Sequence, residues 1–186
     1  MDPGSRVSTP EPGGVSGGTA GGAYLASDGS RMEVLWFTLA AIVVALDQLT
    51  KWLALAGLAL GQPVGLAPFL NLALAFNRGA AFSFLAGQDG WQSTLFALLA
   101  VVAAGVISVL IWRNPARRLF CAGLALILGG ALGNLVDRLR LGQVVDFLDF
   151  HAFGAHWPTF NIADSAITIG AALLIIDGFR GQRKGA

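Results

Sequence analysis

Four long apolar runs, separated by more polar segments, dominate the pattern of the chain. They span Val34–Leu55, Ser93–Trp112, Leu119–Val136 and Ile162–Phe179, and each is 18 to 22 residues long. A helix rises about 1.5 Å per residue, so runs of this length match a hydrocarbon core of about 30 Å. Since a helix satisfies its backbone polar groups internally, the pattern predicts four transmembrane helices.

Two connections between these runs, residues 56–92 and 137–161, are rich in Phe, Val, Leu, Pro and Gly. Both are too apolar for ordinary solvated loops. Within them, Phe69–Phe76 and Val144–Phe150 have the composition of short strands. We therefore expect an all-α membrane protein with a small β addition, in which a short extracytoplasmic sheet and an interfacial helix rest on the membrane surface.

The first 30 residues differ from the rest of the chain. Residues 1–30 consist mainly of Gly, Ser, Pro, Thr and Ala and show no apolar period. This composition predicts a flexible N-terminal extension or tag. Residues 31–186 are then expected to form a single four-helix membrane domain.

The overall composition supports a membrane protein. Hydrophobic residues make up 55% of the chain and charged residues 12%, about half of the ~25% charge of a soluble domain. Disorder needs low hydrophobicity and high charge, so it is excluded for most of the chain. The net charge of +1 provides no global field for nucleic acid. Cys121 is the single cysteine, which rules out an intrachain disulfide, and His151 and His156 alone are a weak metal signal.

Lysine and arginine residues near the span ends indicate an orientation. Seven lie on one side of the four spans and four on the other, which favours both termini in the cytoplasm. The first group comprises Arg31, Arg113, Arg117, Arg118, Arg180, Arg183 and Lys184, and the second comprises Lys51, Arg78, Arg138 and Arg140.

Ionisable residues inside the first span are costly and need an explanation. Asp47 and Lys51 are four residues apart, so both project from one helix face. They either form an ion pair that offsets part of its own burial cost, or orient a site or a lipid head group. In the next motif, Asn77-Arg-Gly79 predicts a tight turn in which Arg78 can bind a phosphate or a carbonyl.

The third span ends in a further polar motif. Asn134, Asp137 and Arg138 fall within about one helical turn. They are expected to hold the helix end to the following loop, or to contain a local Asp137–Arg138 charge pair. Gly129 and Gly133 upstream of them predict close helix packing.

Two more carboxylates lie before and within the start of the fourth span. Asp146 and Asp149 are three apart in a predicted strand, so they face opposite sides and only one faces the bundle. Asp164 follows Asn161 at the start of an apolar helix, where an acid in the first turn or at the N-cap is favoured by the helix dipole.

These acids and amides collect at one end of all four spans, and this arrangement suggests chemistry. Two carboxylates at close range share one proton, because both cannot ionise cheaply. The ionised one activates water while the protonated one donates to a scissile carbonyl, which is aspartic-protease chemistry without a metal. The alternative is a small proton-coupled transporter with Asp47, Asp137 and Asp164 as a relay. A relay needs polar residues spread through the bilayer depth, so their collection at one end favours the protease.

Five motifs in this order resemble those of the bacterial lipoprotein signal peptidase family, also called signal peptidase II. They are Asp47-Gln-Leu-Thr-Lys51, Asn77-Arg-Gly-Ala-Ala-Phe82, Gly133-Asn-Leu-Val-Asp-Arg138, Val144-Val-Asp-Phe147 and Phe160-Asn-Ile-Ala-Asp-Ser165. The resemblance covers about residues 33–179. It implies that residues 31–186 form a four-helix membrane aspartyl protease that cleaves prolipoproteins before a diacylglyceryl-modified cysteine.

The resemblance also assigns roles to residues. It places the catalytic pair at Asp146 and Asp164. Asp137 is the main rival, but its neighbour Arg138 is expected to keep it ionised and engaged; Asp149 lacks a distinctive motif. The residues expected to orient the pair or to hold peptide and lipid are Asp47, Lys51, Asn77, Arg78, Asn134, Asp137, Arg138 and Asn161.

Partners and location follow from the same resemblance. We expect lipid-modified prolipoproteins and membrane phospholipid as partners, no nucleic acid, and a monomer. No metal or other cofactor is expected. The expected location is the bacterial cytoplasmic (inner) membrane, crossed several times, with both termini cytoplasmic and the active site near the outer face.

Overall fold

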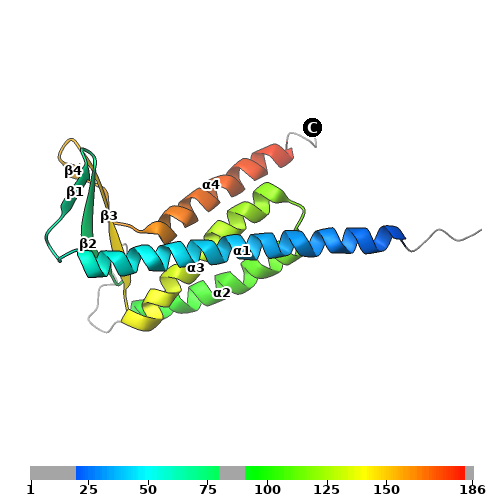
Figure 1. Ribbon diagram of the computed structural model, residues 1–186, viewed down its shortest axis with the longest axis horizontal. Helices are drawn as coiled ribbons and strands as arrows, with labels where there is room; N and C mark the ends of the chain where they lie inside the picture. The colour runs from blue at the N-terminus through cyan, green and yellow to red at the C-terminus, as the bar shows by residue number, and fades with distance from the viewer. Residues whose placement is uncertain (1–19, 80–90, 183–186) are drawn as a thin grey trace, which may run out of the picture.

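A bundle of four helices with a small sheet across one end forms the protein (Figure 1). The computed structural model describes residues 20–79 and 91–182. The helices are α1 (Ala20–Gly57), α2 (Trp91–Arg113), α3 (Arg118–Leu141) and α4 (Ile162–Gln182). Each contains a segment long and apolar enough to cross a membrane, and the four segments predicted as spans are confirmed to be helical.

Helix α1 begins earlier than the sequence predicted. Its start at Ala20 places residues 20–30, assigned above to a flexible extension, in the helix. The N-terminal part of α1 projects beyond the other helices at the end opposite the sheet (Figure 1).

The sheet has four antiparallel strands in the order β1-β2-β3-β4. Predicted strands Phe69–Phe76 and Val144–Phe150 correspond to β2 and β3. The described parts of the two connections contain no separate interfacial helix, because their apolar residues are used in strands; residues 80–90 lie outside the described structure. The strand ranges are β1 (Val64–Ala67), β2 (Leu70–Asn77), β3 (Val144–Ala152) and β4 (Ala155–His156).

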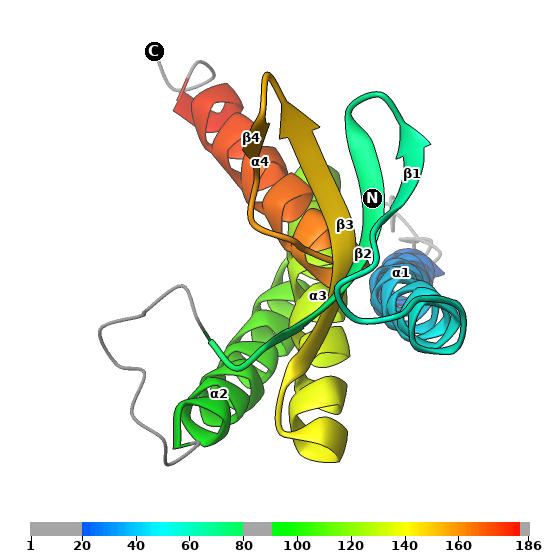
Figure 2. The same ribbon diagram turned by 90° about the vertical axis from the view of Figure 1, so that its left-hand side faces the viewer.

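The position of the sheet over the bundle is set mainly by β3. Figure 2 shows the sheet from the end of the molecule, with β2 and β3 crossing the ends of the helices. β3 contacts α1 and α3, and only Gly142 and Gln143 separate it from the last residue of α3. Gly142 makes this short connection possible, since its φ of 69° lies in the left-handed region that favours glycine. The chain therefore turns directly from the end of α3 into the strand that carries Asp146.

Helix α3 occupies the centre of the bundle and contacts the other three helices. Glycines allow its close approach to α1 and α4. A Cβ at Gly129 would lie 2.6 Å from the Val43 Cβ, and a Cβ at Gly130 would lie 2.4 Å from the Ala163 carbonyl oxygen. Both distances are far below van der Waals contact, so the predicted close packing is confirmed at Gly129.

The end of the bundle opposite the sheet is held by an apolar core. Trp36, Ile111, Cys121 and Leu124 are among its buried residues. The Trp36 indole donates to the Pro115 carbonyl oxygen over 3.0 Å. The buried polar side chains lie instead at the end of the bundle next to the sheet, where the predicted motifs meet. This end is called the sheet end below.

Candidate active site

Buried polar side chains from α1, α3, β3 and the start of α4 meet at the sheet end. Their burial is nearly complete: Asp47 and Asn161 are 0% exposed, and Lys51 and Asp146 are 2% exposed. Buried polar groups of this kind are costly unless they are paired. Among the described residues, every fully buried side-chain nitrogen and oxygen atom has a hydrogen-bond partner.

Asp146 and Asp164 are joined through two asparagine amides. Nδ2 of Asn161 donates to Asp146 Oδ1 over 2.7 Å, and Nδ2 of Asn134 donates to Asp164 Oδ1 over 2.8 Å. The amides also meet each other, since Asn161 Nδ2 lies 3.2 Å from Asn134 Oδ1. The fold thus brings β3 and α4 together around the pair that the resemblance selected.

The local structure of α4 explains the position of Asp164. Asn161 precedes the helix, and its side-chain Oδ1 accepts the backbone N–H of Asp164 over 2.9 Å. This is the geometry of an N-cap, which satisfies one of the free N–H groups at a helix start. Asp164 is therefore the acid in the first turn, while Asn161 supplies the cap.

The electrostatic surroundings of Asp146 favour its protonated form. Burial raises the pKa of this carboxyl, and the nearby charge of Asp164 raises it further. Hydrogen bonds from Asn77 and Asn161 and the positive charge of Lys51 act in the opposite direction. The net effect raises the pKa of Asp146 from 3.8 to about 6. A proton can therefore reside on this group far closer to neutral pH than on an ordinary aspartate.

The predicted Asp47–Lys51 ion pair is present and includes a third partner. The Lys51 Nζ lies 2.8 Å from Asp47 Oδ2 and 2.7 Å from Asp137 Oδ2. It also donates to Asn134 Oδ1 over 2.8 Å, so one ammonium group contacts three acceptors. Because Asn134 contacts Asp164, the lysine is one residue removed from the pair.

Asp137 is engaged by α1 and by the backbone of β3. Its carboxylate accepts the Lys51 ammonium, the Gln48 side-chain amide and the Val145 backbone N–H. Arg138, expected to pair with Asp137, donates instead to the Asn134 carbonyl oxygen over 3.3 Å. Asp137 is therefore structurally engaged, as expected, but the cation that pairs with it is Lys51 and not Arg138.

Arg138 nevertheless faces the site. The negative charges of Asp164, Asp137 and Asp146 all act on its guanidinium, and the effect of Asp164 is the largest of the three. It also lies 5.4 Å from the centre of the Phe96 ring, a cation–π geometry. This supporting residue thus supplies positive charge beside the two carboxylates.

The Asn77 motif forms the expected turn beside Asp146. Asn77 Oδ1 accepts the Gly79 backbone N–H over 2.8 Å, and Gly79 has a φ of 103° that favours glycine. Asn77 also hydrogen-bonds to Asp146. Arg78 is exposed and donates to Gln143 Oε1 over 3.3 Å, so this hydrogen bond lies outside the pair. It lines a cavity of about 350 Å³ together with Arg138.

Asp149 belongs to a separate polar group, as its spacing from Asp146 predicted. Its carboxylate accepts Asn71 Nδ2 over 3.0 Å and lies 2.8 Å from His156 Nδ1. The hydrogen bonds with His156 and Asn71 lower the pKa of Asp149, and the one with His156 has the larger effect. The described residues include no group of three or more His, Cys, Asp or Glu side chains arranged to hold a metal.

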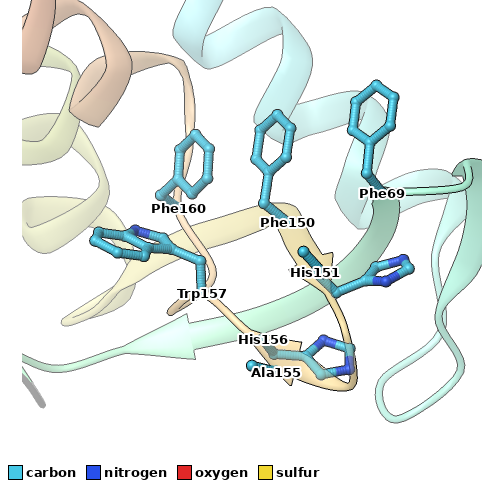
Figure 3. A pocket seen from close by; sticks show the side chains of 8 residues that line it. Phe69, Phe150, His151, Ala155, His156, Trp157 and Phe160 are labelled. Atoms are coloured by element: carbon cyan, nitrogen blue, oxygen red, sulfur yellow. The ribbon is translucent and has the colours of Figure 1, made fainter.

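Two features at the sheet end were not assigned from the sequence. One is Gln48, which contacts both Asp47 and Asp137. The sequence offered a reason to select it, because a polar side chain inside a membrane span is costly and needs a partner. The other feature is an aromatic pocket of about 550 Å³ in the sheet. Figure 3 shows its three phenyl rings, of Phe69, Phe150 and Phe160, side by side and pointing in the same direction. Their centres are 6.0 and 5.6 Å apart.

Comparisons with known proteins cover the whole of this site. Residues 39–180 match the family described as Signal peptidase (SPase) II. A lipoprotein signal peptidase of Paraburkholderia phymatum is 54% identical over 80% of this chain and 89% of its own length. That of Ralstonia nicotianae is 56% identical over 80% of this chain and 86% of its own.

Two solved structures, each described as a bacterial membrane enzyme, have a similar fold. The one determined at 1.9 Å is 35% identical, has a TM-score of 0.67, and is matched over 76% of this chain and 90% of that one. The one determined at 2.3 Å is 33% identical, has a TM-score of 0.71, and is matched over 82% and 92%.

Proposed function

The chain belongs to the signal peptidase II family of membrane proteases, and we propose that it is an aspartic endopeptidase acting through Asp146 and Asp164. Its substrate is a prolipoprotein, cut before the diacylglyceryl-modified cysteine. One observation carries the proposal: two carboxylates from different elements lie around a shared pair of asparagine amides, and Asp164 helps to raise the pKa of Asp146 to about 6.

The proposed chemistry uses one proton shared by the two aspartates. The ionised carboxylate takes a proton from water as the water oxygen attacks the scissile carbonyl carbon. The protonated carboxyl donates its proton to the carbonyl oxygen. The resulting tetrahedral intermediate collapses as the peptide C–N bond breaks and the leaving nitrogen takes up a proton. The products are the signal peptide and a lipoprotein whose first residue is the modified cysteine.

The position of the pair suits a substrate anchored in the bilayer. Acyl chains resist leaving the membrane at about 0.8 kcal/mol per CH₂, so the scissile bond stays near the interface. Asp146 and Asp164 lie where the sheet meets the bundle, at one end of the membrane-spanning segments. The depth of the site therefore matches the depth of the bond.

The orientation that we propose places the sheet end at the outer face. Helix α1 begins and α4 ends at the opposite end of the bundle, where the connection between α2 and α3 also lies (Figure 1). Basic residues Arg31, Arg113, Arg117 and Arg118 are found there, as expected for a cytoplasmic side. The proposed location is the bacterial inner membrane with both termini in the cytoplasm.

The supporting residues divide by what they contact. Asn77, Asn134 and Asn161 hydrogen-bond to the aspartate pair and are proposed to orient it. Arg138 is proposed to balance the charge that develops during cleavage. Arg78, which is exposed, is proposed to contact peptide or phospholipid. We further propose that the protein acts as a monomer without a cofactor.

The test is cleavage of a defined precursor by the purified protein in phospholipid vesicles. A synthetic precursor carrying the diacylglyceryl group on cysteine is compared with the same peptide lacking the lipid. Mass spectrometry is expected to show a single cut on the amino side of the modified cysteine. An intact precursor, or a cut elsewhere, would overturn the proposal.

A further inference from the structure

The residue immediately before each aspartate of the pair donates its backbone N–H to a buried carboxylate, on α1 in one case and on α3 in the other. The backbone N–H of Ala163, which precedes Asp164, donates to Oδ1 of Asp47, on α1, over 2.9 Å. The backbone N–H of Val145, which precedes Asp146, donates to Oδ2 of Asp137, on α3, over 3.1 Å. The positions of Asp47 and Asp137 therefore bear directly on the backbone at both members of the pair.

Two side chains of α1 connect these two carboxylates. The Lys51 ammonium lies 2.8 Å from Asp47 Oδ2 and 2.7 Å from Asp137 Oδ2. The Gln48 Nε2 donates to Asp137 Oδ1 over 2.9 Å and lies 3.3 Å from Asp47 Oδ2. It also donates to the Gly133 carbonyl oxygen over 3.1 Å, which ties α1 to the backbone of α3.

We propose that Gln48 is a positioning residue that, together with Lys51, sets the separation and orientation of Asp146 and Asp164 by clamping Asp47 to Asp137. This inference rests on the proposed function. Gln48 contacts Asp47, Gly133 and Asp137 among the described residues and neither member of the pair, so it acts through others. The side chains of Gln48 and Lys51, with Asp47 and Asp137, are called the clamp below.

The charges in the clamp explain why an amide is suited to position 48. Lys51 supplies one positive charge against the two carboxylates of Asp47 and Asp137. Gln48 adds hydrogen-bond donors without adding charge, whereas a glutamate would place a third carboxylate beside the other two. The packing leaves no slack, since a Cβ at Gly133 would lie 2.6 Å from Asp47 Oδ2.

The first experiment removes the amide and keeps the volume. Gln48→Met is compared with the control variant Leu49→Met. Leu49 is the next residue on α1, and its side chain is 52% exposed on the outside of the bundle. Without the amide, Asp146 and Asp164 are held less precisely, and the rate of cleavage depends strongly on their geometry. Gln48→Met is therefore expected to lower kcat roughly 10- to 100-fold. KM is expected to stay within about twofold, because Gln48 does not contact the proposed substrate site. Leu49→Met is expected to keep the parental values.

The second experiment uses Gln48→Glu to obtain a pH signature. When protonated, the introduced carboxyl group can donate to Asp137 as the amide does; when ionised, it repels Asp47 and Asp137 and competes for Lys51. The ratio of its kcat to the parental kcat is therefore expected to fall as pH rises. For Gln48→Met, which does not titrate, the ratio is expected to stay constant with pH.

The outcomes separate this inference from the function on which it rests. All rates are divided by the folded fraction, measured by near-UV circular dichroism. If the parental protein fails to cut the lipid-modified precursor, the proposed function is wrong. If the parental protein cuts it and Gln48→Met matches Leu49→Met per folded molecule, the clamp is wrong. A pH-independent ratio for Gln48→Glu would likewise contradict it.

Discussion

Asn161 Nδ2 donates a hydrogen bond to Asp146 Oδ1 over 2.7 Å, although the two residues are 15 positions apart and belong to different elements. The same asparagine caps α4 through its Oδ1, which accepts the N–H of Asp164. One buried amide group therefore contacts both members of the proposed pair. This arrangement has consequences for activity and for stability that can be tested separately.

Replacement of either member of the pair is expected to abolish cleavage. Asp146→Asn and Asp164→Asn keep the shape of the side chain but remove the carboxylate that is proposed to take up or donate the proton. Loss of general acid–base catalysis reduces rates roughly 10²- to 10⁴-fold. The measurement is the rate of cleavage of the diacylglyceryl-modified precursor in vesicles.

Asp149→Asn is the matched control for these two variants. Asp149 is a buried aspartate on the same strand as Asp146, but its carboxylate contacts Asn71 and His156. Its replacement is expected to leave the cleavage rate within about threefold of the parental value, well short of the 10²-fold loss expected for a missing acid or base. Full activity in Asp146→Asn or Asp164→Asn, with the protein folded, would refute the assignment.

Asp146→Asn is also expected to stabilise the protein at neutral pH. The pKa of Asp146 is raised from 3.8 to about 6, so the folded state binds its proton more tightly than the unfolded state. Stability from this group is fully present below pH 3.8 and is lost as pH rises to about 6. At pH 7.5 the ionised carboxylate costs roughly 1–3 kcal/mol, which the asparagine avoids.

Thermal unfolding in detergent at two pH values measures this effect. The difference in the free energy of unfolding between Asp146→Asn and the parental protein is expected at pH 7.5 and is expected to shrink toward pH 4. Equal stability of the two proteins at pH 7.5, or a larger difference at pH 4, would argue against a raised pKa.

Gly133→Ala is expected to destabilise the protein and to slow cleavage. The added methyl group would lie 2.6 Å from Asp47 Oδ2, within the clamp. Overpacking of this kind costs about 1–3 kcal/mol. Gly105→Ala is the control, because a Cβ at this position on α2 has no atom within 4 Å. That variant is expected to gain up to about 1 kcal/mol from helix propensity. Equal behaviour of the two alanine variants would contradict the packing argument.

Metal chelation is expected to leave the activity unchanged. The described residues include no group of three or more His, Cys, Asp or Glu side chains that could hold a metal, and the proposed chemistry needs only the two aspartates and water. The test is the cleavage rate before and after treatment with EDTA. A rate that falls with EDTA and returns with added zinc would show that a metal takes part.

Much of the architecture could be predicted from local sequence features. The length of each apolar run determined the four spans, and β-type composition located β2 and β3 within a few residues. The three-residue spacing of Asp146 and Asp149 predicted that they lie in different surroundings, and the structure confirms it. The start of α1 at Ala20 was not predictable, because residues 20–30 are Gly-rich and show no apolar period.

The organisation of the site was decided by tertiary structure. The sequence placed Asp47 and Lys51 on one helix face, but it did not show that Asp137, about 90 residues later, shares the same ammonium. Of the two alternatives that the sequence left open for Asp137, the structure supports attachment of the helix end to the following segment, since Asp137 accepts the Val145 backbone N–H, and it pairs Asp137 with Lys51 and not with the adjacent Arg138. Hydrogen bonds of the clamp and the aspartate pair join residues up to 116 positions apart.

The sequence by itself therefore determined which residue types stand at the sheet end, since span length and motif order are local properties of the chain. Which donor meets which acceptor was decided only when α3 packed against α1 and α4 through its glycines and turned at Gly142 into β3. The physical reason is burial: once the cluster is closed to water, each polar atom must find a partner inside the protein, and the packing of the helices selects that partner.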